Sequence, residues 1–289
     1  MLIELHESIS IPSLLNNSES WLLNATNILE LEKIEVWALK RILNLPPKTP
    51  TAALRYETGT LFVELRIDQR QLIYLHKVLQ RSEDHWTHHI LKILNRMNIG
   101  WAAEINKKLT EYELETDWTK IATSSTVEWK NQVKQAVEKR NQKKLLSLCY
   151  KDRNTEKTKT KYLITRLQEE QYTRNIHKPS MNLSRLQTKA IIMARSSMLD
   201  CATNYKHGYR TVTCKDCMMI DNENHRINEC KKYSGINNYG LTDKFDFNDV
   251  FSESTDVLQC AAHVINSIWD LANGKNLMRH VSREIVIGT

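Results

Sequence analysis

The sequence contains few of the residues that build tight turns, with only 7 glycines and 5 prolines among its 289 residues. Sheet proteins need such residues at many hairpins, and loops that cradle phosphate need several glycines close together. This scarcity argues against a β-sandwich, a β-barrel and a nucleotide-binding loop. Lys, Glu, Leu, Ile, Asn and Gln are abundant instead, and this composition predicts a mostly helical protein.

Long apolar runs are missing as well. No stretch of the sequence approaches the roughly 18 apolar residues of a membrane span. The apolar stretch 9–15 is interrupted by Ser10 and Pro12 and has neither a basic lead nor a small-residue cleavage site, so it does not read as a signal peptide. We therefore expect an intracellular protein, nuclear or cytoplasmic, with no membrane partner.

Familiar catalytic signatures are also lacking. The sequence has no G-x-x-x-x-G-K-[ST] loop, no G-x-S-x-G turn and no pair of adjacent aspartates. His85, His88 and His89 fall on one helical face, but they form no H-E-x-x-H pattern, and we interpret them as a polar surface cluster. The sequence thus predicts no enzyme active site.

Positive charge is in moderate excess, with 41 Lys and Arg against 34 Asp and Glu, a net charge of +7. Such a balance favours polyanionic partners, nucleic acid first. The segment 139–161 is especially basic and includes Lys143 and Lys144. Two interpretations stay open for this segment: a solvated linker or helix end, and an arm that contacts a nucleic-acid backbone.

The most specific pattern is C-x2-C-x7-H-x4-C, formed by Cys214, Cys217, His225 and Cys230. Two thiolates on a tight turn, with an imidazole and a third thiolate on a short following helix, would complete a tetrahedral Cys3His shell. This shell is typical of structural zinc, because no coordination position remains for an activated water. The alternative is a cluster that arose by coincidence or that has decayed.

The three other cysteines, Cys149, Cys201 and Cys260, stand in apolar helical surroundings and are interpreted as buried free thiols. The seven tryptophans occupy helix positions and are interpreted as mostly core residues.

Helical periodicity and cap residues predict a series of helices joined by short loops. Asn24 or Thr26 caps the first long helix, Ser82 or Asp84 opens a later one, and Ser125 with Glu128 forms a capping box. The expected helices cover about 24–43, 51–58, 62–80, 84–97, 101–114, 126–150, 162–175, 184–200 and 255–273. We predict an all-α fold with two helical subdomains, residues 1–138 and 162–289, a basic linker or helix end at 139–161, and the zinc module at 214–230.

Several segments resemble one known family. Residues 11–21 (IPSLLNNSESW) resemble the run that follows the palm in reverse transcriptases of non-LTR (LINE-type) retrotransposons, and residues 39–43 (LKRIL) resemble the thumb helix of those enzymes. Residues 49–59 and 70–76 are similar to the helices that come next. Arg195, followed by the Cys-His spacing, resembles the C-terminal zinc-knuckle region of the same proteins.

The resemblance implies a thumb-plus-knuckle portion of such a reverse transcriptase. In that family the polymerase carboxylates lie in a palm upstream of the matched segment, so no polymerase activity is expected from this chain. The sequence also departs from the family at Asn16 and Asn17, where Tyr-Gly is usual. The implied partners are RNA or DNA, and the remainder of a reverse transcriptase.

The residues expected to contact phosphates are basic. In the thumb-like half these are Lys40, Arg41, Arg66 and Arg70, and in the zinc half they are Lys215, Arg226, Lys231 and Lys232. Such contacts position a nucleic acid without reading its sequence. Two alternatives stay open: a zinc-stapled helical module that binds a protein partner, and a transposon remnant without a selected function.

Overall fold

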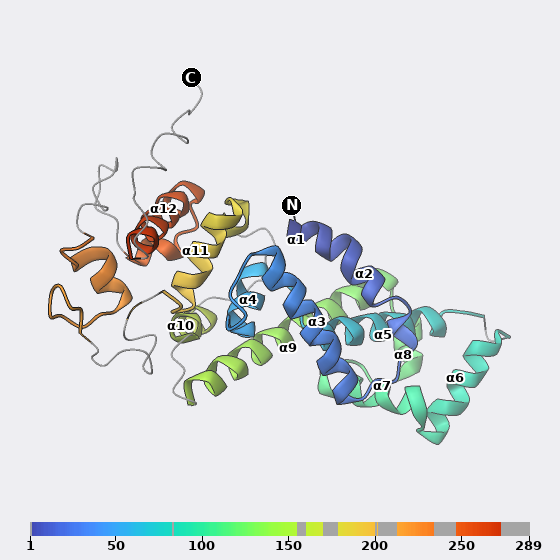
Figure 1. Cartoon of the computed structure of the whole chain (residues 1–289). Helices are drawn as coiled ribbons and strands as arrows, with labels where there is room; N and C mark the ends of the chain where they lie inside the picture. Colours follow the sequence, from blue (N-terminus) through green and yellow to red (C-terminus); the bar gives the residue numbers. More distant parts are fainter. Residues whose placement is uncertain are drawn as a thin grey trace. The chain divides into compact units, whose positions relative to one another are not determined.

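The computed structural model describes residues 2–82, 84–154, 160–169, 179–199, 201, 213–233 and 247–272. Within these ranges the secondary structure is helical apart from one isolated antiparallel bridge between Thr213 and Ile220 (Figure 1). The predicted all-α class is confirmed. None of the helices in the described ranges combines the length and the apolarity that crossing a bilayer requires.

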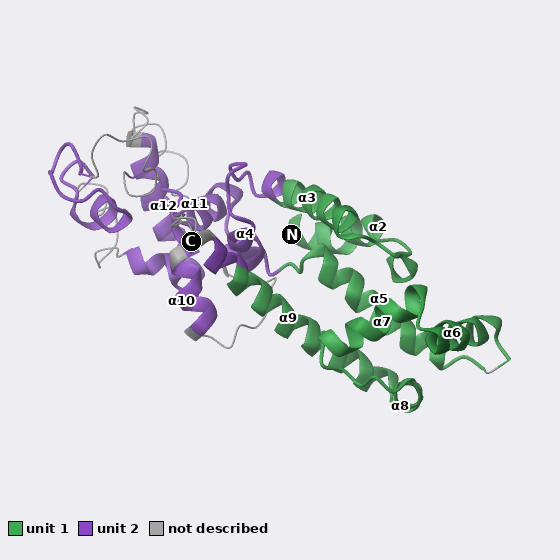
Figure 2. Cartoon of the chain, turned by 90° about the horizontal axis from the view of Figure 1, so that it is seen from below, with its two compact units in different colours: residues 1–39, 60–147, 172–174 green, residues 40–59, 148–171, 175–289 purple. Residues whose placement is uncertain are grey.

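The chain divides into two compact units, each assembled from segments that are distant in sequence (Figure 2). Unit 1 comprises residues 1–39, 60–147 and 172–174, and unit 2 comprises residues 40–59, 148–171 and 175–289. The predicted boundaries at residues 138 and 162 are not those of the units, and they stay a prediction.

The helices of the N-terminal half follow one another with short connections. They are α1 (Leu2–Leu5), α2 (Ile11–Leu14), α3 (Ala25–Ile42), α4 (Thr51–Thr58), α5 (Val63–Leu79), α6 (Trp86–Met97), α7 (Gly100–Glu111), α8 (Trp118–Thr123) and α9 (Thr126–Asn154). The short segments η1 (His6–Ser10) and η2 (Ser18–Ser20) lie before α3. The positions of α3, α4, α5, α6, α7 and α9 agree closely with the helices expected from the sequence, whereas α1, α2 and α8 were not expected.

The C-terminal half has fewer described helices. They are α10 (Lys161–Glu169), α11 (Arg185–Arg195) and α12 (Thr255–Ala272), with the short turns η4 (Pro179–Asn182), η6 (His225–Glu229) and η7 (Phe247–Phe251). Residues 170–175 of the predicted helix 162–175 and residues 155–159 of the basic segment lie outside the described residues.

Local chemistry explains several helix ends. The side chain of Asn24 accepts a hydrogen bond from the backbone N–H of Asn27 at 2.9 Å, so Asn24, one of the two predicted residues, caps α3. Ser125 accepts from the N–H of Glu128 at 3.1 Å at the start of α9. Gly59 ends α4 with φ +63°, in the left-handed region that favours glycine after a helix.

The start of α6 was predicted wrongly. Neither Ser82 nor Asp84 caps it: the ring of His85 accepts the N–H of Thr87 at 3.3 Å, and the helix begins at Trp86. An imidazole acceptor can satisfy the same free N–H group that a serine or aspartate oxygen would satisfy. Sequence rules miss this because histidine is a rare cap.

The core of unit 1 lies around α5. Leu65, Leu72 and Leu75 are almost completely buried there. Trp129 of α9 is also buried, and its indole N–H donates to the backbone oxygen of Leu72 at 2.9 Å. A buried indole needs such a partner, so this contact fixes how α9 lies on α5.

The interpretation of the tryptophans as core residues holds only in part. Trp118 and Trp129 are buried, but Trp37 is 61% exposed and Trp86 is 67% exposed. Among the other cysteines, Cys149 and Cys201 are buried and in no disulfide, as expected, and Cys260 is only half-buried.

A core cluster of unit 2 joins its helices to the cysteine-rich segment. It contains apolar residues of α11 and α12, such as Ile191 and Ile265, together with Phe247 and Val250 of η7. Cys214, Ile227, Cys230 and Tyr233 belong to the same cluster. The inner side of the cysteine-rich segment is thus part of the hydrophobic core of unit 2.

Candidate metal centre

The four predicted ligands converge. One donor atom from each of Cys214, Cys217, His225 and Cys230 lies within 4.8 Å of all the others. The Cys230 sulfur is 3.9 Å from that of Cys214 and 3.8 Å from that of Cys217, too far for a disulfide. In the part of the chain that the structure describes, this is the one group of three or more such side chains that could hold a metal ion.

A tight turn presents the first two cysteines. The N–H of Met218 donates to the oxygen of Cys214 at 2.9 Å, and the N–H of Cys214 donates to the oxygen of Met219 at 2.7 Å. Met218 has φ +60°, a left-handed conformation that is uncommon for a residue with a side chain. The Thr213–Ile220 bridge closes the turn, so the two sulfurs are held on one side.

The other two ligands come from η6 and its end, as the sequence suggested. His225 is the first residue of η6, and the N–H of Cys230 donates to the oxygen of His225 at 2.7 Å. The N–H of Lys231 then donates to the sulfur of Cys217 at 3.3 Å. An N–H directed at a sulfur stabilises its thiolate form and ties the two ligand segments together.

His225 is the residue that most needs an explanation. It is 1% exposed, and neither of its ring nitrogens makes a hydrogen bond, although the Glu229 carboxylate lies 3.6 Å from Nδ1. A buried polar group without a partner costs about 1–3 kcal/mol, because it gives up its bonds to water. A bound metal ion would satisfy one of these nitrogens, so the imidazole fits the role of a ligand.

The surroundings of the cysteine thiols shift their pKa values. Burial and the neighbouring thiols raise the pKa of Cys230 to about 12, although the backbone at Lys232 acts in the opposite direction. Burial also disfavours the thiolate of Cys214, but the side chain of His225 and the backbone N–H groups of Asp216 and Cys217 outweigh it and lower its pKa. A cation at the centre of the cluster would favour all three thiolates, since metal ligation requires the deprotonated form.

Arg226 has a structural role that the sequence prediction missed. Its guanidinium makes two bonds, 2.7 and 2.8 Å long, to the buried carboxylate of Asp221. Burial opposes its charge, but the hydrogen bond and the charge of Asp221 prevail and raise the pKa of Arg226 above its usual range. A separation of five residues is not a helical pairing, so no sequence rule would have suggested this pair.

Replacing Arg226 by Gln is therefore expected to weaken the fold of the segment around the metal ligands. The carboxylate of Asp221 would stay buried without its cation, which costs about 3–5 kcal/mol when a buried pair is broken. The measurement is the rate at which a chelator removes metal, which should rise. An unchanged rate, with nucleic-acid binding lost, would favour the originally predicted phosphate contact instead.

The other predicted cations divide into exposed and internal ones. Lys215, Lys231 and Lys232 are exposed around the ligand cluster. Arg41 and Lys143 are also exposed, and Lys143 lies 3.9 Å from Glu113.

Four cations of the prediction have internal partners. Arg66 is 9% exposed and binds Glu7, with Glu35 at 3.5 Å, so it is a buried structural residue. Arg70 donates to the oxygen of Leu15 at 2.5 Å, and Lys40 donates to that of Pro47 at 2.7 Å. Lys144 pairs with Glu64 and lies over the ring of Phe62.

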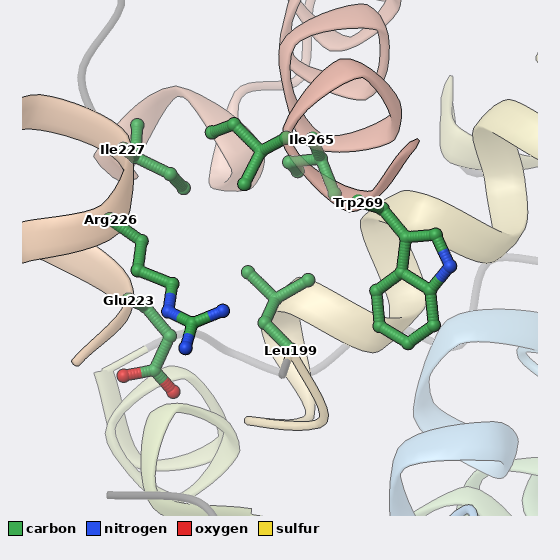
Figure 3. A pocket seen from close by; sticks show the side chains of 7 residues that line it. Leu199, Glu223, Arg226, Ile227, Ile265 and Trp269 are labelled. Atoms are coloured by element: carbon green, nitrogen blue, oxygen red, sulfur yellow. The ribbon is translucent and has the colours of Figure 1, made fainter. Parts of the chain in front are cut away.

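A small hollow lies between η6, Leu199 and α12 (Figure 3). It is a shallow hollow open to solvent, and its walls are mainly Leu199, Ile227, Ile265, Ile268 and Trp269. Its two charged residues are Glu223 and Arg226.

Comparison with protein families, with curated proteins and with solved structures gives no match for this chain. The resemblance to reverse transcriptases therefore stays a proposal.

Proposed function

We propose that the chain is a nucleic-acid-binding fragment derived from a non-LTR reverse transcriptase, with a structural zinc site and no polymerase active site of its own. The observation that carries the proposal is the convergence of three cysteines and one buried histidine beneath exposed lysines. Partners of this module are RNA or DNA, bound through their phosphates.

Zinc is the metal that the ligands fit. Four ligands at a Zn–S distance of about 2.3 Å place neighbouring sulfurs about 3.8 Å apart at the corners of a tetrahedron. The two sulfur separations of 3.9 and 3.8 Å agree with this value. Because three soft thiolates and one imidazole complete the shell, they would hold zinc as a structural ion without an open position for substrate.

Glu229 supports the histidine ligand. Its carboxylate lies 3.6 Å from the Nδ1 atom of His225 and also accepts the side-chain N–H of Asn224 at 2.9 Å. Carboxylates in this position orient metal-binding imidazoles. With Nδ1 beside Glu229, Nε2 is the nitrogen that we assign to zinc.

The surface of the same segment suits an anionic polymer. Lys215, Lys231 and Lys232 are exposed, and Met218 and Ile220 stand beside them at 76% and 61% exposure. Lysines would neutralise phosphates, while exposed apolar side chains can contact unpaired bases. Since Arg66 and Arg226 are held in internal ion pairs, the proposal rests on these three lysines.

The test replaces the three knuckle lysines, Lys215, Lys231 and Lys232, by Gln. Binding to a single-stranded RNA and to the matching DNA is measured by fluorescence anisotropy at several salt concentrations. If each lysine contacts one phosphate, the plot of the logarithm of the association constant against the logarithm of the salt concentration should be shallower by about 2 for the variant than for the native chain. The affinity of the variant at low salt should also be lower.

The matched control replaces Lys107, Lys130 and Lys134 by Gln, which are exposed lysines of unit 1. It changes the net charge equally and should change the slope much less. Both variants must keep one zinc per chain. Equal slopes for the two variants, or affinity that ignores salt, would refute the proposal.

The alternative function is a zinc-stapled module that binds a protein partner. One feature outside the metal centre favours a protein contact, the exposed apolar residues of α6.

A further inference from the structure

Helix α6 carries an apolar stripe on its solvent side. Trp86, Ile90, Ile93 and Met97 are 67%, 48%, 52% and 61% exposed. At 100° per residue, the four side chains fall within about 60° of one another. Scattered exposed apolar residues are ordinary, but four in one line form a continuous surface.

The opposite face of α6 already has its partners. His88 and Leu91 are buried, and the ring Nδ1 of His88 donates to the oxygen of Arg81 at 3.1 Å. Asn95 accepts from the side chain of Asn106 on α7 at 2.8 Å. This buried face lies about 160° from the stripe, so the packing of unit 1 does not account for the stripe. His88 also corrects the prediction that the histidines form a surface cluster.

The stripe is accessible in the folded unit. Helix α6 stands at the outer end of unit 1 in both views, and its inner face packs against α7 and α5 (Figures 1 and 2). Since the helix is fixed on that side, a partner would meet a preformed surface. Binding would not require ordering of the helix, which removes a large cost of association.

The spacing of the stripe identifies the shape of its partner. The steps from Trp86 to Ile90, Ile93 and Met97 are four, three and four residues. This is the a/d spacing of a coiled-coil seam, in which side chains of one helix insert between those of another. A helix that lies on a membrane presents a wider apolar face than this narrow seam.

The charges beside the seam identify the chemistry of the partner. His89 and Arg96 occupy the flanking g positions, while Thr87 and Leu94 occupy the e positions. The sequence from His85 to Ala103 contains no acidic residue. An opposing helix with Glu or Asp beside its seam would pair with Arg96, while a basic one would be repelled.

A second copy of this chain fits less well. In an antiparallel pair of α6 helices, Arg96 would face His89 of the other copy, and in a parallel pair it would face Thr87 or Leu94. Neither arrangement supplies an opposite charge.

We propose that the α6 stripe, formed by Trp86, Ile90, Ile93 and Met97, docks an acidic amphipathic helix of another protein, packed side by side as in a two-stranded coiled coil.

The test uses two synthetic helical peptides of about three heptads, both with Leu at every a and d position. One carries Glu at its e and g positions and the other carries Lys. Fluorescence anisotropy against the full-length chain should show micromolar binding of the Glu peptide. The Lys peptide should bind at least about tenfold more weakly, the factor that corresponds to 1.4 kcal/mol.

Two variants link this binding to α6. The double variant Ile90→Gln/Ile93→Gln should lower the affinity for the Glu peptide at least about tenfold. The variant Arg96→Glu should bind the Lys peptide more tightly than the Glu peptide. The control is Val127→Gln, which removes an exposed apolar side chain elsewhere in unit 1. All changed residues are exposed, so circular dichroism should report an unaltered helix content.

Several outcomes would overturn the proposal. They are equal binding of the two peptides, no binding of the Glu peptide, and unchanged binding by the double variant. Self-association that Ile90→Gln/Ile93→Gln abolishes would assign the stripe to a second copy. Flotation with phosphatidylcholine–phosphatidylserine vesicles, lost in the same variant, would assign it to a membrane surface.

Discussion

Replacing Cys217 by Ser is expected to abolish zinc binding and to unfold the segment around it. Serine has no thiolate, and the remaining three ligands leave the tetrahedral shell incomplete. Structural zinc contributes about 10–16 kcal/mol of apparent binding free energy, far more than the same residues gain without it. Atomic absorption should show zinc falling from one ion per chain to nearly none.

The matched control is Cys260→Ser in α12. Cys260 is half-buried and lies in unit 2 but outside the ligand cluster, so this variant removes a thiol of similar exposure and should keep its zinc. Hydrogen exchange should show lost protection near Cys230 and Tyr233 in Cys217→Ser alone, and chelation of the native chain should reproduce that pattern. A Cys217→Ser chain that retains one zinc, or a chelated chain that stays protected, would contradict the assignment.

Replacing Arg195 by Met is expected to destabilise unit 2 by about 3–5 kcal/mol. Arg195 of α11 binds the buried carboxylate of Glu57 on α4 at 2.7 Å and donates to the oxygen of Val250 at 2.6 Å. Glu57 also accepts the hydroxyl of Ser180 at 3.3 Å. Without the guanidinium of Arg195, the carboxylate of Glu57 stays buried, and of the contacts just described it keeps only the hydroxyl of Ser180. The loss of stability is large for this reason.

The double variant Glu57→Leu/Arg195→Met separates the ion pair from its packing. Because it removes both charges, it should recover much of the lost stability, as measured by hydrogen exchange in α11 and α12. The control is Arg140→Met, the same substitution at an ion pair with Glu111 in which the arginine side chain is 46% exposed. This variant should lose little stability, because exposed ion pairs contribute little. A double variant as unstable as Arg195→Met would show that the side-chain packing of Arg195, and not charge burial, sets the stability.

Local signals in the sequence predicted most of the helices correctly. Asn24, Ser125 and Gly59 act at helix ends in the way that their side chains or backbone freedom dictate. The C-x2-C-x7-H-x4-C spacing also located the ligand cluster, because a turn and a short helix bring residues so close in sequence together without help from the rest of the chain. The cap at His85 was missed because it depends on an unusual acceptor.

The roles of single charged residues were harder to predict. Arg66 and Arg226 looked like surface cations in the sequence, yet both are held by carboxylates whose side chains are at most 14% exposed. A charge pattern along the chain does not reveal which carboxylate will lie beside an arginine after folding, since the partners can be 59 residues apart, as Glu7 and Arg66 are. The surface lysines Lys215 and Lys232 could be predicted because they lie next to ligands on a small module.

The sequence by itself determined the helical class, most of the helix positions and the four residues of the candidate metal centre, because each depends on neighbours within a few residues. Only the tertiary structure decided which side chains are available to a partner. Helical periodicity marks an apolar face on α6, but it does not say whether that face is buried. Packing on α7 and α5 covers the side of His88 and Leu91 and leaves Trp86, Ile90, Ile93 and Met97 in solvent. Burial depends on which segments meet in space, and contacts between distant segments have no local signature in the sequence.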